Sequence, residues 1–197
     1  ENPHQKAALY GYTANSTPLG GQILQGKELS YTNLLDLDAA WKATASFEKT
    51  VVCIVKHLSP CGIACADTVE TAYRLALASD PVSAFGGVIA CNREVDGNAA
   101  NAMVELFVEC IAAPGFSSEA RSIFSKKTNV RLLLMPDLKI DPPVEYRSVN
   151  RGMLKQEIDF GDPPQTEWKV ISERQPTDAE WASLKFAMKA CQHVKSN

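Results

Sequence analysis

The chain lacks several features that would assign it to a common class of protein. No apolar run reaches the roughly 18 residues that a membrane-spanning helix needs, and residues 1–5 (ENPHQ) have neither the basic nor the apolar part of a signal peptide. The net charge is only −3 and no long run of one sign occurs, so a basic surface for nucleic acid is not expected. These absences favour a globular, cytoplasmic protein that binds neither membranes nor nucleic acid.

Motifs that hold phosphates or activate a serine are also missing. The sequence contains no G-x-x-x-x-G-K-[ST], no G-x-G-x-x-G and no G-x-S-x-G. A zinc site of the nucleobase-deaminase type needs Pro-Cys-x-x-Cys and an upstream His-x-Glu. Here three residues separate Cys61 from Cys65, and no histidine precedes a glutamate by two positions. We therefore expect no zinc, and we interpret both cysteines as packing residues around a turn.

The material that is present suits one sizeable core. The 197 residues are 45% hydrophobic and 22% charged, an ordinary globular composition. Most of the six cysteines lie in apolar segments such as residues 51–55 (VVCIV), which is typical of free thiols in a reducing compartment.

Helical and extended patterns alternate over the first two thirds of the chain. Apolar spacing predicts a helix over residues 32–47, with Thr32 or Asn33 as N-cap, and a second over 68–80, with Thr68 as N-cap. Two more are predicted over residues 96–107 and 117–127. Short apolar runs predict strands over residues 23–25, 50–57, 86–92, 108–114 and 129–136. Such alternation favours an α/β sheet that is covered on both faces and at least partly parallel.

The regular alternation of helical and extended patterns ends after Asp137. Two Pro-Pro pairs and few periodic runs predict an extended connection, with short strands around residues 146–156. Thr177 then begins a last helix with Trp181, Leu184 and Met188 on one side. We therefore divide the chain into residues 1–137, an α/β unit, and residues 138–197, a connection and helix.

Two titratable side chains, Lys56 and His57, end the predicted strand over residues 50–57. Ligand crevices of α/β sheets lie outside the carboxyl ends of strands, so we expect both side chains at the rim of a site once the following Ser-Pro sequence turns the chain. The alternative is a solvated lysine beside a histidine that binds a loop carbonyl.

Residues 83–87 (SAFGG) separate a predicted helix from a predicted strand. Paired glycines allow a ligand to approach the backbone closely, and Phe85 could lie against a flat ring. The alternative is a tight turn with a core phenylalanine.

An ordered series of segments resembles the 5-aminoimidazole-4-carboxamide ribonucleotide (AICAR) formyltransferase domain of the bifunctional purine biosynthesis enzymes. The segments are residues 1–5 (ENPHQ), 24–41 (LQGKELSYTNLLDLDAAW), 54–64 (IVKHLSPCGIA), 80–96 (DPVSAFGGVIACNREVD), 111–116 (IAAPGF) and 193–197 (HVKSN). The resemblance spans the chain and is weak between residues 138 and 178. It implies cytidine deaminase-like α/β/α layers, the first of two repeats, without zinc.

The resemblance also implies a reaction and its residues. Members of this family transfer a formyl group from the co-substrate 10-formyltetrahydrofolate to the amine of AICAR. The residues implied to be catalytic are Lys56, His57 and Asn197. Those implied to bind AICAR or line its site are Asn33, His4, Ser83, Phe85 and Gly86, and those implied to lie near the folate are Glu109 and Pro114.

The chemistry accounts for these residue types. The AICAR amine is a poor nucleophile because its lone pair is delocalised into the ring, so attack needs a base, and a histidine titrating near neutrality suits this role. On this hypothesis His57 accepts the amine proton, directly or through the carboxamide. Lys56 stabilises or protonates the departing folate nitrogen, and Asn197 binds the developing oxyanion.

Parts of the family pattern do not occur in this sequence. An Arg-Tyr-Gly element, a second repeat and the companion IMP cyclohydrolase domain are missing. We expect a fragment that holds the Lys-His half of the site and pairs as a homodimer. The alternative function is a non-catalytic ligand-binding or assembly module of the same fold.

Overall fold

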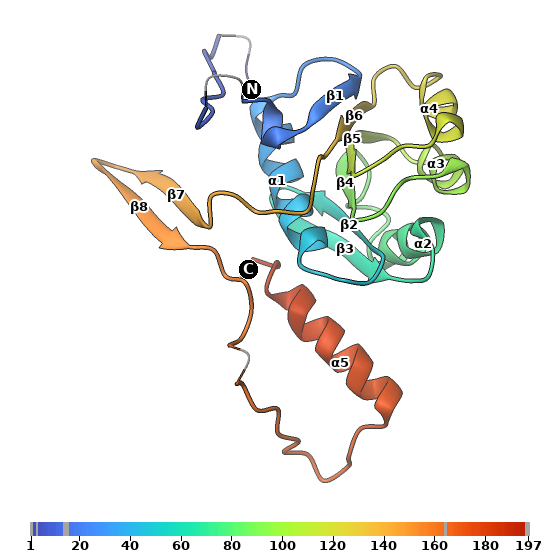
Figure 1. Ribbon diagram of the computed structural model, residues 1–197, viewed down its shortest axis with the longest axis vertical. Coiled ribbons are helices and arrows are strands. Elements are labelled where there is room, and N and C mark those ends of the chain that lie inside the picture. The colour runs from blue at the N-terminus through green and yellow to red at the C-terminus, as the bar shows by residue number, and fades with distance from the viewer. Residues whose placement is uncertain (1, 3, 14–15, 164, 196–197) are drawn as a thin grey trace. The chain divides into compact units, whose positions relative to one another are not determined.

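The computed structural model describes residues 2, 4–13, 16–163 and 165–195. They fall into two units, Glu1–Lys139 and Ile140–Asn197, which are taken in turn (Figure 1).

A six-stranded mixed sheet forms the centre of the first unit, in the order β1-β6-β5-β4-β2-β3. Strand β5 runs parallel to β4 and β6, whereas the β1–β6, β2–β4 and β2–β3 pairs are antiparallel. The strands are β1 (Gln22–Gln25), β2 (Val51–Lys56), β3 (Ser59–Cys65), β4 (Gly87–Cys91), β5 (Val108–Ala113) and β6 (Arg131–Leu134). The predicted α/β class and its partly parallel sheet are confirmed.

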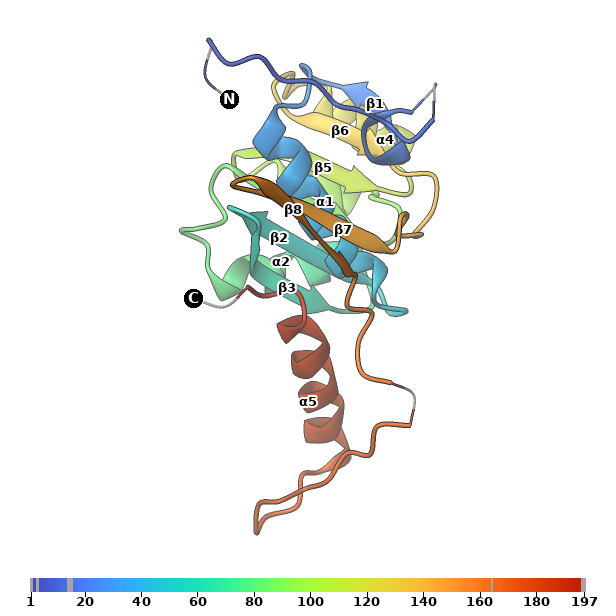
Figure 2. The same ribbon diagram turned by 90° about the vertical axis from the view of Figure 1, so that its left-hand side faces the viewer.

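Helices cover both faces of this sheet. The helical elements are η1 (Pro18–Gly20), α1 (Tyr31–Ala45), α2 (Val69–Ser79), α3 (Gly97–Met103) and α4 (Ser118–Phe124). Figures 1 and 2 show α1 on one face and α2, α3 and α4 on the other. Strand β2 is buried along almost its whole length, because alternate side chains point to opposite faces and both faces are covered.

The main apolar cluster lies between the sheet and α2, α3 and α4. It joins Val52 and Ile54 of β2 to Tyr73 of α2 and Phe124 of α4. Burial of such side chains stabilises the fold by roughly 1.5–3 kcal/mol each. This packing fixes the strands, and therefore the residues at their ends.

The prediction of a turn over Cys61 and Cys65 is wrong. Residues 59–65 form the edge strand β3, and the turn lies before it, at His57 and Leu58, because Lys56 pairs with Ser59 across the hairpin. This is two residues earlier than the predicted Ser-Pro turn. Helix α2 lies very close to this strand at Gly62, because glycine has no side chain. A Cβ added there would sit 2.0 Å from the Ala76 carbonyl oxygen of α2.

The start of α1 also differs from the prediction. Ser30, rather than Thr32 or Asn33, is the N-cap, and Asn33 is its capping-box partner. The pattern S-x-x-N resembles the usual S/T-x-x-E/Q capping box, with an amide in place of the glutamate or glutamine. Helix α2 begins after the predicted cap, Thr68, and α3 ends at Met103, four residues earlier than predicted.

The second unit contains a hairpin and a helix. Strands β7 (Val144–Val149) and β8 (Gly152–Glu157) pair antiparallel, which confirms the predicted strands. Helix α5 (Asp178–Cys191) begins after the predicted cap, Thr177, in a capping box with Glu180. Arg174 donates to both carboxylate oxygens of Glu180 at 2.9 Å.

Candidate active site

The turn that carries His57 has an unusual backbone. His57 and Leu58 are the two loop residues between β2 and β3, and their φ angles are 55° and 67°. Positive φ at both central residues is the signature of a type I′ turn, which normally uses Asn-Gly. Left-handed backbone costs about 1–2 kcal/mol for each residue with a side chain. Strain of this kind collects at functional sites, where the surroundings hold it in place.

Lys56 connects this turn to the glycine segment. Its Nζ donates to the Gly86 carbonyl oxygen at 2.9 Å, and the two residues meet because β2 pairs with β4. Gly86 has a φ of 68°, which glycine adopts freely, and its N–H donates to the Phe107 carbonyl at 2.8 Å. The structure therefore brings the strand end that carries Lys56 and His57 together with Gly86, which stands in a separate segment of the sequence.

Two exposed aromatic rings lie beside this contact. The centroids of Phe85 and Phe107 are 5.4 Å apart, with 61% and 45% of these residues exposed. The turn before them is fixed by Asp80, whose carboxylate accepts from the Ser83 N–H at 2.9 Å. Hydrogen bonds from Ser83 hold the pKa of Asp80 below its usual value. The rings offer an apolar surface next to the Lys56 ammonium.

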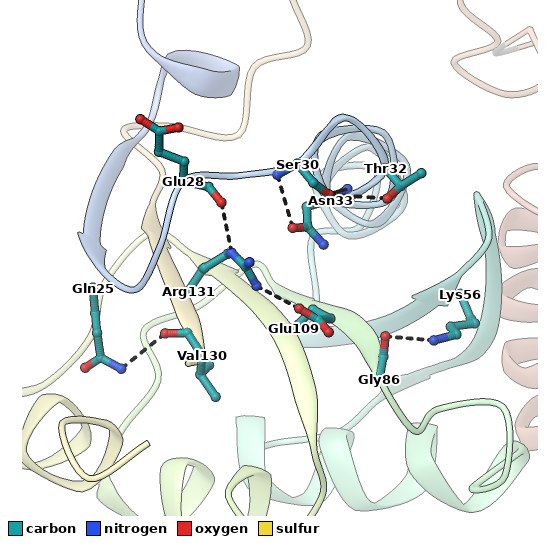
Figure 3. A network of polar contacts seen from close by, with 10 residues as sticks. All are labelled: Gln25, Glu28, Ser30, Thr32, Asn33, Lys56, Gly86, Glu109, Val130 and Arg131. Atoms are coloured by element: carbon teal, nitrogen blue, oxygen red, sulfur yellow. Dashed lines mark hydrogen bonds and ion pairs between the residues drawn. The ribbon is translucent and has the colours of Figure 1, made fainter. Parts of the chain in front are cut away.

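Glu109 lies on the neighbouring strand and is held by an arginine. Arg131 of β6 donates to Glu109 Oε2 at 2.7 Å and to the Glu28 carbonyl oxygen at 3.2 Å. The Arg131 side chain is only 15% exposed. Figure 3 shows this guanidinium between Glu109 and the segment that leads into α1. One cation thus fixes both a candidate folate contact and the approach to the candidate nucleotide contact, Asn33.

Asn33 is nearly buried at the first turn of α1. Its Oδ1 accepts from the Ser30 N–H at 3.2 Å, and its own N–H donates to Ser30 Oγ at 3.1 Å. Because the side-chain oxygen serves the cap, a ligand contact by this residue would be donation from its amide nitrogen.

The cluster lies at the amino ends of the parallel strands, whereas the sequence predicted a site at carboxyl ends. Lys56 ends β2, but β2 is antiparallel to β4, so Lys56 lies at the amino ends of the parallel strands together with Gly86, Glu109 and Arg131. Pro114 follows the opposite end of β5, about 16 Å along the strand from Glu109. The structure therefore does not place Pro114 with the others.

The structure does not place two further predicted site residues, His4 and Asn197, with the cluster. His4 is exposed in a segment outside the helices and strands. Asn197 lies outside the described residues.

Comparison with known proteins decides the family. A model of the AICARFT/IMPCHase bienzyme family matches residues 1–197. The chain belongs to this family. It is 46% identical over 201 residues to the bifunctional purine biosynthesis protein PurH of Nostoc sp., 46% over 200 residues to that of Rhodospirillum rubrum, and 44% over 200 residues to that of Synechocystis sp.. Each comparison covers 100% of this chain and 38–39% of the relative, so the chain spans about two fifths of the length of these relatives.

Three buried cysteines, Cys53, Cys91 and Cys110, are poorly suited to catalysis. Burial raises the pKa of the Cys110 thiol to about 12 and raises the pKa values of the Cys53 and Cys91 thiols further above their ordinary range. A thiol is nucleophilic as the thiolate, so these three residues are inert packing groups at neutral pH.

The zinc motif of the deaminases is not reproduced by the geometry. Cys61 and Cys65 are four residues apart on β3, so their Cα atoms are about 13 Å apart, too far to bind one metal ion. Among the described residues, no group of three or more His, Cys, Asp and Glu side chains could hold a metal. Within the same ranges, no helix is both long enough and apolar enough to cross a membrane.

Three residues near the cluster were not singled out from the sequence: Arg131, Phe107 and Asp36, whose carboxylate accepts from the Leu58 N–H at 2.7 Å. Arg131 is the single cation in the apolar run 130–135 (VRLLLM), and Glu109 is the single acid in 106–113 (LFVECIAA). A charge in a buried strand needs a partner, so their pairing could have been predicted. Asp36 and Phe107 gave no such signal, since helix acids and apolar residues before a strand are common.

Proposed function

We propose that this chain supplies the Lys-His part of an AICAR formyltransferase site. The observation that carries the proposal is the hydrogen bond between Lys56 Nζ and the Gly86 carbonyl oxygen at 2.9 Å. It joins the strand end that carries His57 to the segment, Ser83–Gly86, that resembles the family's substrate and folate site. Membership of the AICARFT/IMPCHase family supports the same reaction.

In the proposed reaction the amine nitrogen of AICAR attacks the formyl carbon of 10-formyltetrahydrofolate. A carbon–nitrogen bond forms to AICAR, and the bond from the formyl carbon to folate N10 breaks. His57 accepts the proton that the amine loses, and Lys56 stabilises or protonates N10 as it departs. The products are formyl-AICAR and tetrahydrofolate.

The proposed ligands lie on either side of the Lys56–Gly86 contact. On the nucleotide side, Asn33 donates its amide to AICAR. On the folate side, Glu109 accepts from the flat ring system and Phe85 packs against it. Asn197, and the homodimer expected for the family, complete the site.

The proposal extends to the architecture. Residues 1–137 form a cytidine deaminase-like layer structure that represents the first of two repeats, and residues 138–197 connect it to the second. The three-layer arrangement around a mixed sheet supports this proposal.

A chimera tests the function directly. This chain replaces the matching two fifths of the Nostoc sp. relative, and formyl transfer is measured with AICAR and 10-formyltetrahydrofolate. We expect turnover by the chimera. A control is the IMP cyclohydrolase activity of the same molecule, because that domain lies outside the replaced segment in the family.

The contradicting result is equally clear. If the chimera keeps its cyclohydrolase activity and shows no formyl transfer, the chain is a ligand-binding or assembly module and the proposal is wrong.

A further inference from the structure

The turn that carries His57 is tied to helix α1 by one carboxylate. The Leu58 N–H donates to Asp36 Oδ1 at 2.7 Å, across 22 residues of sequence. Asp36 lies in the second turn of α1 and is partly buried. Charge-assisted bonds of this length are among the stronger hydrogen bonds in proteins.

The turn needs such a partner for two reasons. In a two-residue hairpin the closing hydrogen bond joins the residues that flank the loop, so the N–H of the second loop residue, Leu58, must find its acceptor elsewhere. In addition, a leucine with a φ of 67° is unfavourable without an outside constraint. A carboxylate at 2.7 Å from the Leu58 nitrogen meets both needs.

Asp36 also relates His57 to the nucleotide side of the cluster. Asn33 and Asp36 are three residues apart on α1, and residues at this spacing share a helix face. Asn33 is fixed by the Ser30 cap, and Asp36 fixes the turn. One face of α1 thus carries the candidate amide donor, Asn33, and the carboxylate that binds the turn of the candidate base, His57.

We propose that Asp36 is a positioning residue, whose carboxylate holds the strained turn at His57 and Leu58 and thereby sets the direction of the His57 side chain. The importance of that direction rests on the proposed function. The hydrogen bond between Asp36 and the turn is a property of the folded chain, so its effect on His57 can be measured without substrate.

The test compares variants of the whole chain by NMR. The ring signals of His57 are assigned by their loss in His57→Gln, and amide exchange reports the turn. In Asp36→Ala we expect the His57 ring signals to move and exchange of the Leu58 amide to accelerate about tenfold or more. Asp36→Asn keeps an oxygen acceptor, so its His57 signals should stay near those of the wild type.

A matched control lies on the same helix. Asp38 forms an ion pair with Lys42 at 2.6 Å, and Asp38→Ala should leave the His57 signals unchanged. If Asp36→Ala does not fold, the comparison is made between Leu58→Gly and Asp36→Ala/Leu58→Gly, because glycine relieves the strain at the turn.

The outcomes separate this inference from the proposed function. His57 signals that coincide in the wild type and in folded Asp36→Ala would overturn the positioning role, as would equal displacement by Asp36→Asn and Asp36→Ala. Absence of formyl transfer in the chimera overturns the proposed reaction and does not alter the NMR comparison.

Discussion

Arg131 shows what a single residue contributes to the cluster. Its guanidinium is largely buried and donates to the Glu109 carboxylate and to the Glu28 carbonyl. Removing one partner of such a pair leaves a charge that is poorly solvated. The pair therefore belongs to the fold as much as to the candidate site.

For Arg131→Gln we expect a loss of about 1–3 kcal/mol in the free energy of unfolding, measured by urea denaturation. The matched control is Arg74→Gln, whose pair with Glu70 is exposed and should contribute less than about 1 kcal/mol. Equal effects of the two substitutions would contradict the account of Arg131.

Individual residues of the candidate site could be predicted from the sequence, but the contacts between them could not. Lys56 and Gly86 were singled out from their local patterns, at the end of one strand and just before another, whereas Glu109 was named through the family resemblance. Their meeting depends on which strands pair, and the strand order β4-β2-β3 is set by tertiary packing. Asp36 was not found because its partner, Leu58, lies in a turn that local pattern placed two residues too late.

Among the elements, helices with clear caps were predicted and the edge strand was not. Thr68 and Thr177 are side-chain caps ahead of periodic segments, and such signals are local. The segment that forms β3 contains Pro60 and Gly62, which usually mark turns. An edge strand tolerates both, and here Gly62 is required by the approach of α2.

Gly62→Ala should therefore be severely destabilising. Its methyl group would sit 2.0 Å from the Ala76 carbonyl oxygen, so α2 must move away from β3, at a cost of about 3 kcal/mol or more. Gly152→Ala is the control, because its methyl group would lie 3.6 Å from the Val149 side chain. A melting temperature of Gly62→Ala that matches that of the wild type would refute this account of the packing.

Helix α5 should be sensitive to acid at its first turn. Hydrogen bonds, first from Arg174 and then from Thr177, lower the pKa of Glu180 from 4.5 to about 2. Because the folded-state pKa lies below the unfolded value, the stabilisation is complete above pH 4.5 and is lost as the pH falls towards 2.

Amide exchange across α5 measures this effect. Protection should decline over that window in the wild type, whereas Glu180→Gln should show weaker protection at neutral pH and a smaller decline. An identical pH dependence in both proteins would show that Glu180 is not the group responsible.

On the scale of the whole molecule, the family was recognisable from ordered segments although no single motif decides it. The family model matches residues 1–197, and the chain spans about two fifths of its curated relatives. The α/β class followed from alternating apolar patterns. The position of the cluster at the amino ends of the parallel strands did not follow, because the direction of β2 was not predicted and the strand is antiparallel to both of its neighbours.

The most direct test of the central claim is kcat for formyl transfer by the chimera with and without His57→Ala. If His57 is the base, its loss should lower kcat by about 100-fold or more, while cyclohydrolase activity stays unchanged. A His57→Ala chimera that transfers formyl groups at a near-normal rate would contradict the assignment of Lys56 and His57 as the catalytic pair.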